Sequence, residues 1–62
     1  MSNWTVRVAL TTDRMRSMPA AEIEAELRRI LTEEHVTLSD ETIADWAAKT
    51  SQGFQITPKG LD

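Results

Sequence analysis

The single histidine is the first residue to consider for chemistry, because two acidic residues precede it. His35 follows Glu33 and Glu34, and imidazole and carboxylate groups together form a donor set that divalent metals accept. Consecutive residues of a helix point in different directions, however, so the side chains of Glu34 and His35 do not converge. We therefore interpret His35 as a helix-terminal residue in solvent, and we predict no metal site.

The hydroxyl and glycine residues do not form a catalytic pattern either. No serine lies in the glycine-flanked elbow of a nucleophile, and the 2 glycines of the chain are too few for a phosphate-binding loop. Acidic residues are plentiful, but a domain this small hardly forms the cleft that acid–base catalysis needs. We expect a protein that is not an enzyme, with no cofactor and no small-molecule substrate.

Length and composition indicate one small domain. The chain has 62 residues, of which 40% are hydrophobic, and it has no cysteine. Residues 1–62 are therefore interpreted as a single domain without disulfides. A domain of this size buries only about 60% of its unfolded surface, so a partner subunit would add to a marginal stability. No segment is apolar enough to span a membrane, and no signal-peptide pattern is present. We expect a cytoplasmic protein with no membrane partner.

The charge is distributed unevenly along the chain. The formal net charge is −3, but residues 1–19 contain three arginines and one aspartate, whereas residues 20–62 contain four cations and nine acids. Proteins that bind nucleic-acid phosphates usually have a basic face, and only the N-terminal third could provide one here. We interpret most of the other charges as solvated helix faces.

The segment NWTVRVAL, residues 3–10, alternates in side-chain type. In a strand, one face would carry Trp4, Val6, Val8 and Leu10, and the other face would carry Asn3, Thr5, Arg7 and Ala9. This alternation of β-branched and aromatic residues predicts a half-buried strand over about residues 4–10. The polar stretch of residues 11–18 predicts a loop, in which Ser17 caps the following helix.

Two amphipathic helices are predicted next, over residues 19–35 and 39–50. Each has one apolar stripe at helical spacing, and Ser39 is a suitable N-cap for the second helix. Residues 36–38 are either a connector or a brief strand, and the alternation of residues 54–57 predicts a short final strand. The expected fold is therefore α+β, in the order strand, helix, helix, strand (β-α-α-β).

The order of elements over residues 3–50, with the stretch VTLSDETIADWAAK, resembles the ribbon-helix-helix repressors. The resemblance implies a dimer whose paired strands enter the major groove of DNA and read bases with Asn3, Thr5 and Arg7. Residues 11–18 are longer than the connection in that family. Asp40 and Glu41 would also repel a phosphate at the start of the second helix. A dimeric DNA-binding regulator is therefore the alternative function.

The leading hypothesis is a small regulatory module that binds another protein or a second copy of itself. Small acidic inhibitors of phages and mobile elements, including anti-CRISPR proteins, are similar in size and charge, although no motif carries this likeness. An acidic row on the first helix would face a basic partner: Glu22, Glu26 and Glu33. Methionine beside arginine is common at adaptable binding surfaces, and the expected contact residues are Trp4, Arg7, Arg14, Met15, Arg16 and Met18.

Overall fold

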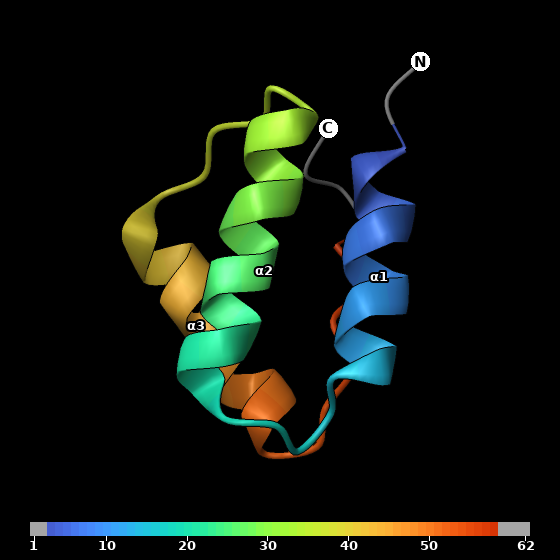
Figure 1. The fold of residues 1–62 in the computed structure, drawn as a ribbon, viewed down its shortest axis with the longest axis vertical. Helices are drawn as coiled ribbons and strands as arrows, with labels where there is room; N and C mark the ends of the chain where they lie inside the picture. Colours follow the sequence, from blue (N-terminus) through green and yellow to red (C-terminus); the bar gives the residue numbers. More distant parts are fainter. Residues whose placement is uncertain (1–2, 59–62) are drawn as a thin grey trace.

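The chain folds into three helices followed by an extended segment. The computed structural model describes residues 3–58, in which α1 spans Trp4–Arg14, α2 spans Ala20–Glu33 and α3 spans Asp40–Ser51. Helices α1 and α2 run in opposite directions, α3 crosses behind α2, and the segment after α3 returns behind α1 (Figure 1). The packing of α2 on α3 is more extensive than that of α1 on α2. No helix within residues 3–58 has the length and apolar character that crossing a membrane requires.

The core lies between the three helices. The two helices predicted over residues 19–35 and 39–50 are confirmed as α2 and α3, and their apolar stripes face this core. Complete burial of one large aliphatic side chain stabilises a fold by about 1.5–3 kcal/mol. The buried hydrophobic cluster consists of Trp4, Val8, Ile23, Leu27, Ile30, Leu31, Ile43, Trp46 and Ala47.

The α+β prediction is wrong, because the described residues 3–58 contain helices and no strand. Residues 4–10 belong to α1, which continues into the predicted loop. A lone strand would leave its backbone donors and acceptors unpaired, whereas a helix pairs them internally. This requirement outweighs the β propensity of the segment. The helix also gathers one buried face at positions i, i+4, i+7 and i+8, formed by Trp4, Val8, Thr11 and Thr12.

The predicted C-terminal strand is wrong as well. Residues 54–58 have no regular secondary structure, and residues 36–38 form a connector. The C-terminal segment is attached to α1 by hydrogen bonds instead of strand pairing. Ile56 N donates to Thr12 Oγ1 at 3.1 Å, and Gln55 Nε2 donates to Ala9 O at 3.0 Å. The segment thereby covers one flank of α1.

The helix ends follow the local sequence signals only in part. Ser39 caps α3 as predicted, since its Oγ accepts a hydrogen bond from Thr42 N at 3.1 Å. Ser17 does not cap α2, because Pro19 occupies the N-cap position and provides no side-chain bond. Ser17 instead has a φ of 70°, and its amide donates to Thr50 O at 3.0 Å. The loop between α1 and α2 is thereby tied to the end of α3.

Candidate functional site

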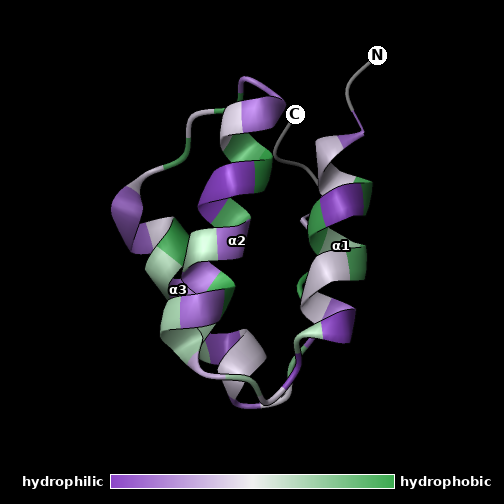
Figure 2. Cartoon of the chain, viewed as in Figure 1, coloured by the Kyte–Doolittle hydropathy of each residue, from purple (hydrophilic) through white to green (hydrophobic). Residues whose placement is uncertain are grey.

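The outer face of α1 exposes two large aliphatic side chains. Val6 is 53% exposed and Leu10 is 60% exposed, and Figure 2 shows hydrophobic stretches on the side of α1 that faces away from α2. Residues four apart lie on the same face of a helix. Val6 and Leu10 therefore form one apolar strip, which we call the α1 stripe. The α1 stripe is not part of the core. The hydrophobic residues that α1 contributes to the core are Trp4 and Val8, which lie on the opposite face of the helix.

On one side, the α1 stripe is bordered by the C-terminal segment. A shallow groove of about 220 Å³ lies between this segment and α1, and its wall is mostly apolar. Its lining consists of Thr5, Val6, Ala9, Thr57 and Pro58. Because Val6 belongs to both the groove and the stripe, the two form one continuous apolar surface.

On the other side, the α1 stripe is bordered by a charged groove between α1 and α2. This groove of about 200 Å³ is lined by Arg7, Leu10 and Arg14 from α1 and by Glu26 and Arg29 from α2. Leu10 is thus the point at which the apolar stripe meets the charged groove. A partner that covers Leu10 would also lie close to the charged side chains.

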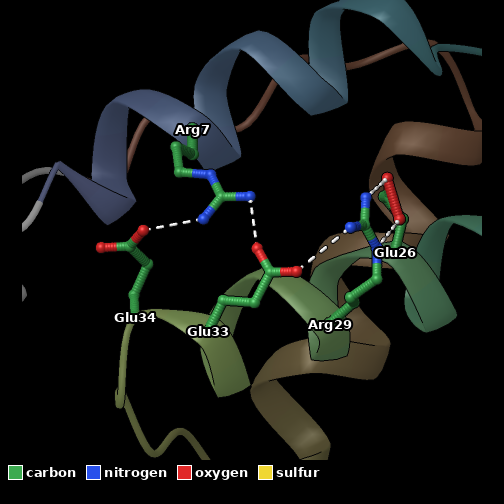
Figure 3. A network of polar contacts seen from close by, with 5 residues as sticks. All are labelled: Arg7, Glu26, Arg29, Glu33 and Glu34. Atoms are coloured by element: carbon green, nitrogen blue, oxygen red, sulfur yellow. Dashed lines mark hydrogen bonds and ion pairs between the residues drawn. The ribbon is translucent and has the colours of Figure 1, made fainter.

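A chain of alternating charges connects α1 to α2 along this groove (Figure 3). Arg7 donates to Glu34 Oε2 at 2.7 Å and to Glu33 Oε1 at 2.8 Å. Glu33 also accepts from Arg29 at 3.2 Å. The Nε and Nη2 atoms of Arg29 in turn donate to the two oxygens of Glu26 at 2.8 and 2.5 Å. The ends of α1 and α2 are therefore linked by charge-assisted hydrogen bonds.

These bonds shift the pKa values of the groups in the network. The hydrogen bond from Arg7 lowers the pKa of Glu33, and the hydrogen bonds from Arg29 lower the pKa of Glu26, while partial burial opposes both shifts. The positive charge of Arg14 lowers the pKa of Glu26 further. Two members of the predicted acidic row, Glu26 and Glu33, are thus occupied by arginines of the same chain.

The structure places the expected contact residues in different environments. Trp4 lies in the core with only 8% of its surface exposed, and Met15 packs against that core. Arg7 is held by two glutamates, as described above. Met18 in the following loop is 37% exposed. These four residues therefore do not form one exposed surface that a partner could contact.

The two remaining arginines of this set differ in their pairing. Arg16 forms an ion pair with Asp13 at 3.4 Å. Arg14 is exposed and forms no ion pair, and within residues 3–58 every other arginine or lysine forms at least one. Arg14 is therefore the predicted contact residue that the structure leaves most available.

The residues assigned to DNA reading do not form the row that the resemblance implied. Asn3 is exposed, Thr5 is half-buried beside the apolar groove, and Arg7 is engaged with α2. In a helix, residues two apart point to different sides, so these three side chains do not present a common edge. The geometry of a ribbon is absent from the described residues, and DNA binding itself stays a prediction.

Sequence reasoning missed Val6 and Leu10 as surface residues. Their alternation with Trp4 and Val8 placed them on the buried face of the predicted strand. A helical pattern was available in the same segment, because Trp4 and Val8 continue at helical spacing into the threonines at positions 11 and 12. That pattern would have left Val6 and Leu10 outside.

The geometry of these surfaces is the basis for a functional interpretation. Comparisons of the chain with protein-family models, with curated proteins and with solved structures find no match. Within residues 3–58, no group of three or more acidic, histidine or cysteine side chains is placed to hold a metal ion. The α1 stripe with its two flanking grooves is the strongest candidate for a functional site.

Proposed function

We propose that this protein is a small helical binding module that acts by occupying the surface of another protein through the α1 stripe. The observation that supports the proposal is the exposure of Val6 and Leu10 on a helix whose opposite face fills the core. Single exposed hydrophobic residues are normal on protein surfaces. Here the two residues lie one turn apart and continue into an apolar groove, so they form a contiguous patch.

The energetics of this patch favour association. Removing a large aliphatic side chain from water contributes about 1.5–3 kcal/mol, and aliphatic residues at positions i and i+4 are the usual anchors when helices bind one another. The apolar groove beside Val6 makes this surface concave, so that a partner side chain can fit into it. A partner that covers Val6, Leu10 and the groove would therefore bury most of the exposed apolar surface of α1.

Selection from an unbiased display library of short peptides tests the proposal. The chain is used whole, and each enriched peptide is measured again with Leu10→Asp and with Phe54→Asp. Phe54 is a matched control, because it is also 60% exposed but lies after α3, outside the α1 stripe. We expect Leu10→Asp to abolish binding of the enriched peptides and Phe54→Asp to leave it unchanged.

Two results would contradict the proposal. One is a selection in which no peptide is enriched above background. The other is a set of ligands that lose affinity with Phe54→Asp and keep it with Leu10→Asp. Circular dichroism of both variants shows whether the helices are intact, so that a loss of binding is not confused with unfolding.

A further inference from the structure

Among the cations of residues 3–58, Arg14 is the one that forms no ion pair. The protein contains more acids than bases, with 10 acidic residues and 7 lysines and arginines. On such a chain an unpaired arginine is unexpected, and within residues 3–58 the other arginines and the lysine all reach a carboxylate. No carboxylate within residues 3–58 therefore engages the five donors of the Arg14 guanidinium, which can bind a group of a partner.

The nearest carboxylate within the groove does not satisfy Arg14. Glu26 lines the groove together with Arg14, but its two oxygens accept the hydrogen bonds of Arg29 at 2.8 and 2.5 Å. The alternation of charges in Figure 3 begins at Glu34 and ends at Glu26. Arg14 lies next to that end, so one more carboxylate beside Arg14 would continue the alternation.

Arg14 also continues the α1 stripe. Val6, Leu10 and Arg14 follow one another at intervals of four residues, so they form a single row along the exposed side of α1. A helix laid along this row would meet two aliphatic side chains and then a guanidinium. The complementary sequence has aliphatic residues one turn apart and an acidic residue at the end that lies over Arg14.

We propose that the partner presents an amphipathic helix whose aliphatic residues cover Val6 and Leu10 and whose aspartate or glutamate side chain binds Arg14. This inference rests on the proposed function and specifies the chemistry of the partner. Arginine binds a carboxylate through two parallel hydrogen bonds, which fixes the direction of the bound helix as well as its position. The acidic residue of the partner thus determines the orientation of the bound helix, and its aliphatic residues contribute the buried apolar area.

A second copy of this chain fits the surface less well. If two α1 helices packed antiparallel over their stripes, Arg14 of each would lie opposite the first turn of the other, and that turn contains no acidic residue. In a parallel arrangement, Arg14 would face Arg14. Both arrangements leave the cation without a counterion, so the charge pattern favours a different, acidic partner.

The peptides enriched on the whole chain provide the probe for this inference. We expect them to carry an acidic residue about one turn beyond an aliphatic pair. Arg14→Ala should weaken their binding about tenfold, as expected for loss of a hydrogen-bonded charge pair. Arg16→Ala is the matched control, because Arg16 is paired with Asp13 of its own chain, and it should change the affinity less than about twofold.

A charge exchange makes the test specific for the pair. Arg14→Glu should reduce the binding of an acidic peptide more than Arg14→Ala does, and replacing the acidic residue of the peptide by lysine should restore binding to Arg14→Glu. Peptides that depend on Leu10 but bind the wild type and Arg14→Ala equally would overturn the inference and leave the proposed function intact. Enrichment of basic peptides would overturn it as well. The absence of any Leu10-dependent peptide would overturn both proposals.

Discussion

Two threonines of the core should respond in opposite directions to the same substitution. Thr12 and Thr50 are both completely buried. The hydroxyl of Thr12 donates to Val8 O at 2.9 Å and accepts from Ile56 N at 3.1 Å. Within residues 3–58, the hydroxyl of Thr50 has no hydrogen-bond partner. Replacement by valine keeps the shape of the side chain and removes only the hydroxyl, so it isolates the contribution of the hydrogen bonds.

The expected magnitudes follow from the partners that each hydroxyl has. Thr12→Val leaves the partly buried amide of Ile56 without an acceptor, which costs about 1–3 kcal/mol. Thr50→Val removes a buried polar group that has no partner, and this should stabilise the fold by about 1 kcal/mol. Valine and threonine have similar helix propensities, so the backbone contribution nearly cancels. For a domain of this size, each kcal/mol moves the Tm by about 4–8 °C.

Chemical and thermal unfolding measured by circular dichroism and by fluorescence test this prediction, because both tryptophans lie in the core. Hydrogen exchange gives an independent local readout, since the amide of Ile56 should exchange faster in Thr12→Val and remain unchanged in Thr50→Val. The reasoning is refuted if Thr50→Val destabilises the protein as much as Thr12→Val does. In that case, the hydroxyl of Thr50 would be satisfied in solution.

Three further predictions concern the charges and a helix cap. Glu26 and Glu33 have lowered pKa values in the folded protein, so the stability they contribute is present above the usual carboxyl pKa and is lost as the pH falls through the lowered values. Acid titration of the Tm should show this loss, and Arg29→Gln should make it less steep. Ser39→Ala removes the side-chain hydrogen bond that caps Thr42 N at the start of α3 and should cost about 1 kcal/mol in urea unfolding. Arg7 is held by two glutamates of its own chain. We therefore expect the wild type and Arg7→Ala to give the same anisotropy of a labelled DNA duplex at low salt. Tight, salt-dependent binding that this variant abolishes would instead support the ribbon-helix-helix alternative.

Helices α2 and α3 could be predicted from the sequence because their local and long-range signals agree. Ile23, Leu27 and Ile30 recur at helical spacing, and all three are buried in the structure. Ser39 begins α3 with the side-chain bond that its position indicates. In both helices the apolar pattern and the propensities favour the same structure, and in α3 the cap agrees as well, which is the condition under which a local prediction holds.

Helix α1 could not be predicted in this way, because its signals conflict. Alternation and β-branched residues favour a strand, while the spacing of Trp4, Val8 and Thr12 fits a helix. The conflict is resolved only by tertiary structure, because no other segment of the described chain offers a strand for pairing. The charge network was also beyond prediction, since it joins Arg7 to Glu33 and Glu34 across more than 20 residues.

The failure of the local prediction and the candidate site have the same origin. The core does not require apolar residues at positions 6 and 10, and polar residues there would have given the sequence a plain helical pattern. Val6 and Leu10 are instead apolar and exposed, and they create the alternation that resembles a strand. Positions that break the local rules without a benefit to the fold are expected to serve function. The proposed binding partner would therefore give a physical reason for the valine and leucine that make α1 look like a strand.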